Sequence, residues 1–201
     1  MDPKLATILL HDVKNALGIL EGELSDMTVA PTSEQALQAH ANCVGLREKL
    51  IGFLTLYRAS SLGLAAHIEA VSPEDFLRAL IANRAVGKSD LPVSIKLENM
   101  PVLGFFDEHL VGLALEAALH NATRFARTLV ELACRTDGTD LVFSVRDDGP
   151  GLGTKEETPS TGLGMALCSA IGEAHRRNGR AGIASLSDHP QGGALFELRL
   201  P

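Results

Sequence analysis

The stretch Asp147-Asp148-Gly149-Pro150-Gly151 decides the fold, together with Gly162-Leu163-Gly164-Met165-Ala166-Leu167. The first stretch follows an alternating apolar run, Leu141 to Val145, which predicts a β-strand. A carboxylate at the end of such a strand can accept a hydrogen bond from an exocyclic amine, while the glycines let backbone approach a flat ligand. The second stretch puts two glycines before an apolar helical run and so aims backbone N–H groups at an anion. Together they indicate a nucleotide site with an adenine end and a phosphate end.

The bulk composition excludes several classes of protein. Hydrophobic residues make up 45% and charged residues 21% of the 201 residues, as in ordinary globular proteins. The net charge of −7 and the single Tyr without any Trp argue against nucleic-acid binding, so local groups must hold any anionic ligand. The three cysteines, Cys43, Cys134 and Cys168, are too scattered for a metal site and favour a reducing, cytoplasmic setting. No apolar run approaches the ~20 residues that span a bilayer, so we expect no direct membrane insertion.

The N-terminal part predicts a pair of helices, domain 1–64. Apolar residues recur at steps of three and four from about Pro3 to Asp26, close to heptad spacing. Pro31 ends this pattern, and Thr32 with Gln35 resembles a capping box that opens a second helix running to about Ser60. The second helix has two apolar stripes, which a lone hairpin cannot bury. We therefore expect a four-helix bundle across a homodimer. The stripes are Leu37, Ala41, Val44, Ile51 and Leu54, and Leu46, Leu50, Phe53 and Tyr57.

The remainder, domain 65–201, predicts an α/β sandwich with helices on one face of a mixed sheet. The small-residue segment from Ser60 to Val71 is the expected hinge between the domains. The expected helices are 73–84, 107–126 and 165–174, the first with Ser72 as its N-cap. The expected strands are 93–97, 128–134, 141–146, 182–187 and 194–200, with a hairpin around Asp137-Gly138.

Two sets of polar residues could take part in chemistry. Asn121 and Arg124 share roughly one face of the helix 107–126, where an amide oxygen suits Mg²⁺ and a guanidinium suits phosphate. On this stretch alone, an ordinary surface Asn and a surface Arg are the favoured interpretation. His11 is expected to point away from the seam of the first helix, with Asp12 able to accept its proton and Asn15 one turn further along the same side. The pattern indicates a nucleophile with an acidic neighbour and leaves its substrate open.

In this order, the motifs resemble the transmitter core of bacterial sensor histidine kinases over nearly the whole chain. His11 to Asn15 is similar to the phosphoacceptor box of that family, and Asn121 to Phe125 to its asparagine box. Asp147 to Leu152 and Gly162 to Leu167 are similar to its two glycine boxes, and Gly193 to Pro201 to its closing strand. Four ordered motifs are far more specific than any one of them. The expected fold is therefore a dimeric helical hairpin followed by an α/β sandwich of the histidine kinase ATPase type.

The resemblance implies roles on the hairpin. His11 would take the γ-phosphoryl group of ATP, with Asp12 as the base that activates it. The phosphoryl group would then pass to an aspartate on the receiver domain of a response regulator. Asp12 and Asn15 also fit the acid-x-x-Asn pattern that such proteins use to dephosphorylate the same partner.

The resemblance also implies a set of residues that bind ATP and Mg²⁺. Asn121 would ligate Mg²⁺, Arg124 would contact phosphate, and Asp147 would bind the adenine amine. The remaining residues implied for nucleotide binding are Gly149 and Gly151 at the base pocket, and Gly162, Leu163 and Gly164 beside the lid.

Four features depart from the family pattern. Ala117 stands where related ATPases carry a catalytic glutamate one turn before the asparagine, and the adjacent Glu116 is rotated by about 100° on the helix. That departure disfavours an enzyme that hydrolyses ATP, and it is tolerable in a kinase whose nucleophile is His11. The segment 153–161 is short for an ATP lid, and Ser160 replaces a glycine that often opens the second box. Met1 precedes His11 by ten residues, so input is expected from a separate sensor protein or other partner.

These departures support alternatives to a kinase. The first is a histidine phosphotransferase or response-regulator phosphatase of the same architecture, with weak or no use of ATP. The second is a non-enzymatic dimeric scaffold. Retention of Asn121, Asp147, Gly151, Gly162 and Gly164 favours a working ATP site, so the kinase ranks first.

Overall fold

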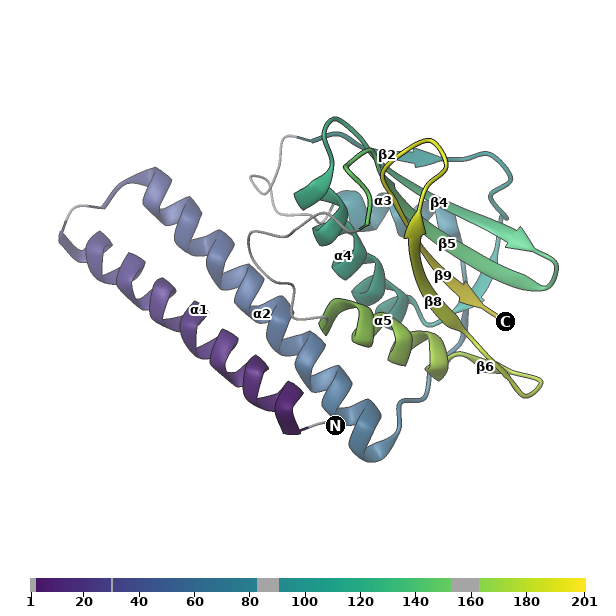
Figure 1. The fold of residues 1–201 in the computed structure, drawn as a ribbon, viewed down its shortest axis with the longest axis horizontal. Helices are drawn as coiled ribbons and strands as arrows, with labels where there is room; N and C mark the ends of the chain where they lie inside the picture. Colours follow the sequence, from purple (N-terminus) through teal and green to yellow (C-terminus); the bar gives the residue numbers. More distant parts are fainter. Residues whose placement is uncertain (1–2, 30, 83–90, 153–162) are drawn as a thin grey trace. The chain divides into compact units, whose positions relative to one another are not determined.

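The structure, a computed structural model, describes residues 3–29, 31–82, 91–152 and 163–201. Within these ranges the chain forms two compact units that divide between Gly63 and Leu64. The first unit is a pair of helices and the second combines helices with sheet (Figure 1). Each unit is described separately below.

The hairpin unit contains helices α1 (Pro3–Val29) and α2 (Ser33–Leu62). α2 begins at the capping box that the sequence predicts. The Thr32 side chain accepts a hydrogen bond from the Gln35 N–H, and the Gln35 side chain accepts one from the Thr32 N–H. Because both N–H groups would otherwise lack a helical partner, the box fixes where α2 starts.

α1 and α2 pack along a narrow seam. The α2 residues Ala39, Leu46 and Leu56 are buried, with exposed fractions between 4% and 9%. A polar pair interrupts the seam, because Asn42 Nδ2 donates to Glu23 Oε1 at 2.6 Å. The other oxygen, Glu23 Oε2, is buried and accepts no hydrogen bond from the described residues. Polar groups at such positions fix the register of helices at a cost in stability. Large apolar side chains remain exposed on the unit, namely Leu17, Ile19, Leu24, Val29, Leu37, Leu50, Leu54, Tyr57 and Leu62.

The second unit is built on a five-stranded sheet in the order β2-β4-β5-β9-β8. β2 and β4 run parallel, and the other neighbours run antiparallel, so the sheet is mixed as expected. The β4–β5 hairpin turns after Asp137, as predicted, and Asp137 pairs with Asp140. The strands are β2 (Val93–Lys96), β4 (Val130–Asp137), β5 (Asp140–Asp147), β8 (Ile183–Asp188) and β9 (Ala194–Leu200).

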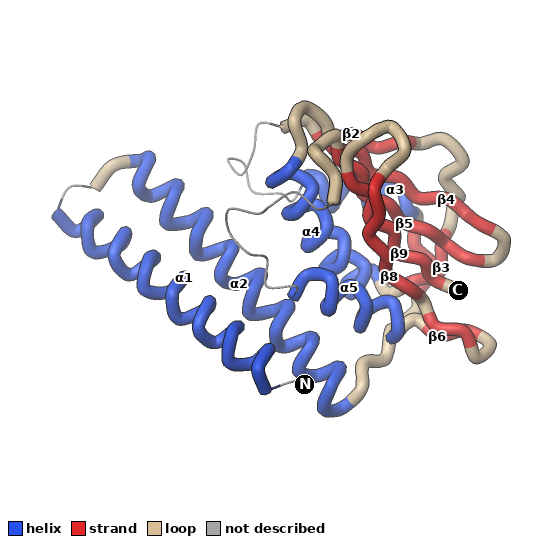
Figure 2. The backbone as a smooth tube through the Cα atoms, viewed as in Figure 1, coloured by secondary structure: helices blue, strands red, loops and turns tan. Residues whose placement is uncertain are grey.

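The helices α3 (Pro73–Ala82), α4 (Glu108–Phe125) and α5 (Leu163–Ala174) gather on one side of this sheet (Figure 2). The core between the layers contains Phe76 of α3, Phe106 and Phe143, whose rings meet edge to face with centroids 5.0–5.8 Å apart. Phe106 and Phe143 are fully buried. Edge-to-face packing of this kind adds to the stabilisation from burial alone. This two-layer arrangement confirms the predicted α/β sandwich.

Two short strand pairs were not predicted. β1 (Glu69–Val71) pairs with β3 (Gly104–Phe106), and β6 (Arg176–Arg177) pairs with β7 (Arg180–Ala181). The predicted hinge also has to be corrected, because α2 extends to Leu62 and β1 begins at Glu69. The segment without regular structure is therefore only Gly63 to Ile68.

Candidate nucleotide site

Asp147, the last residue of β5, is the buried acid around which the site is built. Its exposed fraction is 6%. The carboxylate oxygen Oδ1 accepts the Gly149 N–H at 2.8 Å and the Ala194 N–H at 3.2 Å. Within the described ranges no donor bonds to the second oxygen, Oδ2. One oxygen thus fixes the side chain in place, and the other can accept a hydrogen bond from a ligand.

Two glycines bring backbone close to this acid. Gly193 has a φ of +86°, and a Cβ there would overlap the carbonyl oxygen of Asp147. A Cβ at Gly149 would lie 2.5 Å from the carbonyl oxygen of Phe125. Both positions therefore require glycine for close packing of the strand ends. The prediction placed Gly149 at the site, whereas it missed Gly193 and Ala194.

Asn121 and Gly164 meet where α4 and α5 face each other. A Cβ at Gly164 would lie 3.7 Å from Asn121 Nδ2 and 3.9 Å from the Cβ of Ala117. The Asn121 side chain is exposed. The asparagine and the second glycine stretch, 43 residues apart in the sequence by their numbers, are thus adjacent in space. Leu163 is the first residue of α5, while Gly162 lies outside the described residues, as do Ser160 and the predicted lid 153–161.

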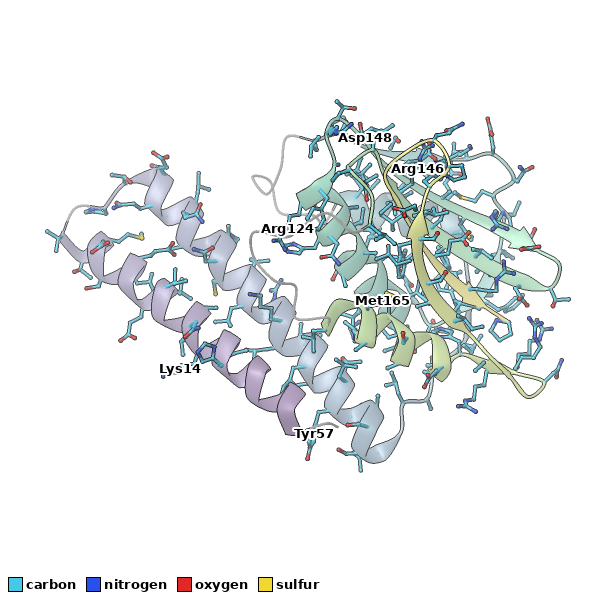
Figure 3. The ribbon with its side chains drawn as sticks, viewed as in Figure 1. Lys14, Tyr57, Arg124, Arg146, Asp148 and Met165 are labelled. Carbon is cyan, nitrogen blue, oxygen red and sulfur yellow. The ribbon has the colours of Figure 1, made fainter. Side chains whose placement is uncertain are left out.

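Arg124 lies in the last turn of α4, separate from Met165 in the first turn of α5 (Figure 3). It is exposed, and its guanidinium carbon is 5.0 Å from the centroid of the Phe125 ring. A cation over an aromatic face is weakly attracted to it. This contact orients a basic group near the end of the helix that carries Asn121.

The first glycine stretch is tied to the end of β8 by Asp188. Leu152 N–H donates to Asp188 Oδ1 at 2.6 Å, and a Cβ at Gly151 would lie 2.6 Å from the same oxygen. Sequence reasoning missed Asp188, because its approach depends on the register of β8 against β9. Gly151, which was predicted, lies directly beside it.

Asp148 binds the turn between α4 and β4 (Figure 3). Its carboxylate accepts the N–H groups of Arg127, Thr128 and Leu129 and the hydroxyl of Thr128. These hydrogen bonds, from the Thr128 side chain first, hold the pKa of Asp148 far below its usual range. Asp148 is therefore a charged structural group beside the site.

The predicted phosphoacceptor residues lie on α1 in the hairpin unit. His11 and Asn15 are both exposed, and Asn15 Nδ2 lies 3.2 Å from His11 Nδ1. The spacing of one helical turn brings them together, as the sequence predicts. Asp12 belongs to the same helix, and its side chain is outside the described part of the structure.

Comparison with known proteins identifies the second unit. Residues 106–201 match the family described as histidine kinase-, DNA gyrase B- and HSP90-like ATPase. Residues 106–201 are thus similar to the ATPase domain of this family. The match begins at Phe106 and includes Asn121, Asp147 and Gly164.

The similarity to histidine kinases extends beyond the ATPase domain. Sensor protein KdpD of Escherichia coli (strain K12) is 26% identical over 220 residues, an alignment that covers 98% of this chain and 24% of KdpD. Sensor histidine kinase CpxA of the same strain is 29% identical over 44% of this chain and 22% of CpxA. The chain therefore spans about a quarter of the length of these relatives. Over nearly its whole length it is similar to part of a sensor histidine kinase.

Solved structures share the fold. Histidine kinase AdeS of Acinetobacter baumannii has a TM-score of 0.69 at 17% identity, with 94% of this chain and 96% of that chain covered. Histidine kinase ThkA in complex with response regulator protein TrrA has a TM-score of 0.61 at 15% identity, over 99% of this chain and 61% of that one. Both matches cover the helical hairpin as well as the ATPase domain.

The residues of the ATPase domain fit a nucleotide with a bound Mg²⁺. The Asp147 carboxylate is held in place through one oxygen, and the exposed Asn121 on α4 offers an amide oxygen. Across the described ranges, no three His, Cys, Asp or Glu side chains cluster as metal ligands. A Mg²⁺ ion here would complete its coordination with phosphate oxygens and water, as it commonly does.

Two further features of the described residues concern the buried cysteines and the apolar content of the helices. Burial raises the pKa of the Cys134 and Cys168 thiols to about 12, so neither is a nucleophile at neutral pH. No helix in the described ranges has the length and apolar content required to cross a membrane.

Proposed function

We propose that this chain is a two-component protein-histidine kinase that transfers the γ-phosphoryl group of Mg-ATP to His11 and then to an aspartate of a response regulator. The observation that carries this proposal is the half-satisfied Asp147 carboxylate. Its Oδ1 is fixed by two backbone N–H groups, while Oδ2 accepts none from the described residues. An adenine amine is a donor that suits such an oxygen.

The nucleotide would be bound from two sides. Asp147 would accept the adenine amine, with Gly149 and Gly151 leaving room for the base. Asn121 would ligate Mg²⁺ and Arg124 would contact the phosphates, while Leu163 and Gly164 would offer the first N–H groups of α5. Mg-ATP, when bound, would supply the γ-phosphoryl group, with ADP as the leaving group.

The acceptor step would take place on α1. A His11 ring nitrogen forms the new N–P bond as the bond from the γ-phosphorus to the bridging oxygen breaks, and ADP leaves with the electron pair. Asp12 would take the ring proton. The contact of the Asn15 amide with His11 Nδ1 would orient the ring on α1. Phosphohistidine would then give its phosphoryl group to the receiver aspartate.

The proposed partners follow from the same arrangement. A receiver domain would dock on the exposed face around His11, and the complex of ThkA with TrrA supports a partner of this class. The exposed apolar residues of the hairpin unit support a homodimer held by a four-helix bundle. This complex would act in the cytoplasm.

A phosphatase activity toward the same receiver is the second candidate. The contact between Asn15 and His11 favours it, because an amide held at the phosphoacceptor can orient a water for attack on the receiver's phosphoryl group. A relay without ATP would have no need for the fixed carboxylate of Asp147, and for this reason it ranks below the kinase.

The test is incubation of the full chain with γ-labelled ATP and Mg²⁺. We expect acid-labile label on the wild type and none on His11→Ala. On Asp147→Asn we expect at least about a hundredfold less label, because a binding site that loses a buried hydrogen bond to its ligand typically loses this much activity. Asp75→Asn, an exposed aspartate on α3, is the matched control and should keep the label.

Calorimetry with ATP separates the alternatives. Nucleotide binding that is lost only in Asp147→Asn supports the kinase. Absence of both label and nucleotide binding in the wild type would contradict the kinase and leave the relay, which would then show phosphoryl exchange with a receiver through His11.

A further inference from the structure

A basic hairpin lies at the end of the sheet away from the nucleotide site. β6 and β7 are joined by Asn178 and Gly179, both with positive φ, and carry Arg176, Arg177 and Arg180. Arg180 donates to Asp140, which begins β5, whereas Asp147 ends it. The two ends of this strand are separated by about 23 Å at roughly 3.3 Å per residue. The hairpin is thus independent of the proposed nucleotide site.

The charges of this hairpin are only partly balanced. Arg180 is paired with Asp140 at 2.7 Å, and the neighbouring Arg199 is paired with Asp137 and Asp140. Arg176 donates to the backbone carbonyl of Glu173. In the described part of the chain, no carboxylate forms an ion pair with Arg176 or Arg177. Two cationic groups therefore remain unneutralised in a chain whose net charge is −7.

Arg177 stands in an unfavourable position for stability. It is the direct cross-strand partner of Arg180. Like charges at opposed positions of an antiparallel pair repel each other and destabilise the pair. The ion pair of Arg180 with Asp140 offsets part of this repulsion, and an anion bound at Arg177 would offset the remainder.

The two unneutralised arginines line a pocket of about 310 Å³ together with apolar side chains. We call this the arginine pocket; its lining is Ile68, Phe105, His175, Arg176, Arg177 and Pro201. Phe105 is 62% exposed and Ile68 46% exposed, so both present apolar surface to a ligand. Burial lowers the pKa of His175, so its imidazole adds no positive charge to the pocket at neutral pH.

We propose that the arginine pocket docks an acidic segment of a partner protein. An apolar side chain of that segment packs against Phe105 and Ile68, while flanking carboxylates pair with Arg176 and Arg177. Arginine with an aromatic neighbour is the combination that dominates many protein interfaces, and arginine binds carboxylates through two parallel hydrogen bonds. The hollow shape favours an inserted side chain over the flat surface of an anionic membrane.

The experiment measures fluorescence anisotropy of a labelled peptide added to the full chain without nucleotide. The peptide consists of glutamates around a central leucine. We expect saturable binding to the wild type and at least about tenfold weaker binding to Arg177→Glu and to Phe105→Ser, since each removes one of the few contacts that carry an interface. Lys96→Glu makes the same charge change on the far edge strand β2 and should bind as the wild type does.

Thermal unfolding separates binding from folding. Arg177→Glu places opposite charges across the hairpin, so its Tm should equal or exceed that of the wild type. Equal peptide binding by wild type and Arg177→Glu, equal losses in Arg177→Glu and Lys96→Glu, or no saturable binding would each overturn the proposal. Arg177-dependent capture by phosphatidylserine vesicles, with no peptide binding, would overturn it in favour of a membrane surface.

Discussion

Asp147 and Asp148 are neighbours in the chain, but their carboxylates bind different groups. Asp147 faces the candidate adenine end, while Asp148 accepts N–H groups from the turn that follows α4. The hydrogen bonds to Asp148 keep its pKa far below its usual range. Because the folded state depresses this pKa, the stabilisation is fully present above the ordinary range near pH 4 and is lost as pH falls through the folded value.

We expect Asp148→Ala to lower the free energy of unfolding by about 1–2 kcal/mol at neutral pH, as for loss of a helix cap, because water can replace only part of these hydrogen bonds. Urea unfolding followed by circular dichroism measures the change. Glu98→Ala, which removes an exposed carboxylate of the same unit, should change stability by less than about 0.5 kcal/mol. A cost for Asp148→Ala that stayed constant into strong acid would contradict this account.

At the scale of single residues, the sequence predicts the acid of the site but only part of its surroundings. Asp147 and Gly149 are recognisable because they follow an alternating strand within one short stretch. Ala194, which bonds to Asp147, is 47 residues further along the chain. That contact depends on the register of β5 against β9, and no local pattern in a single sequence specifies such a register.

At the scale of elements, His175 joins three parts of the second unit. Its Nδ1 lies 2.8 Å from the Ile171 carbonyl within α5, and its Nε2 accepts the Asp107 N–H at 3.1 Å. Asp107 in turn caps α4 through the Leu110 N–H and accepts the His67 N–H. These contacts require the neutral imidazole with its proton on Nδ1. Sequence reasoning missed this link, because a lone histidine at a helix end carries no distinctive pattern.

We expect this link to make stability depend on pH. Burial lowers the pKa of His175 below its ordinary 6.5, so between the two values the unfolded state binds more protons, and stability falls as pH falls below about 6.5. His175→Gln should show a smaller loss of Tm between pH 7.5 and 5.5 than the wild type, and about 1–3 kcal/mol lower stability at neutral pH.

The exposed His109 of α4 provides the matched control. His109→Gln should follow the wild type at both pH values. If His175→Gln lost as much Tm on acidification as the wild type does, another group would be responsible for the pH dependence.

Helices, strands and turns were predicted best where the sequence pattern that specifies them lies within a few residues. The capping box at Thr32 and the turn after Asp137 are coded within a few residues, and both are present. β1 and β3 are three residues each and pair across a separation of more than thirty residues, so neither period nor length marks them. The β6–β7 hairpin was missed although Asn178-Gly179 is the strongest short signal for such a turn.

At the scale of the whole molecule, the two units bury their apolar surface to different degrees. The second unit encloses its phenylalanine cluster, whereas the hairpin unit leaves Leu24, Leu37, Leu54 and Tyr57 each more than half exposed. Two helices cannot cover two apolar stripes, and water contact with such side chains is unfavourable. A second copy of the hairpin would cover them with the same surface, as two-fold dimers do.

We therefore expect the chain to be a homodimer by analytical ultracentrifugation. Each leucine that is fully buried in the dimer contributes about 1.5–3 kcal/mol to the free energy of association. Each substitution is present in both subunits, so its effect is doubled. Leu24→Glu combined with Leu54→Glu should therefore yield monomers at micromolar concentration. Leu186→Glu, which changes a 45% exposed leucine on β8 of the other unit, should remain dimeric. If the dimer survived Leu24→Glu with Leu54→Glu but dissociated with Leu186→Glu, the interface would lie on the ATPase domain. If the wild type were a monomer, another partner would have to cover the exposed apolar residues of the hairpin unit.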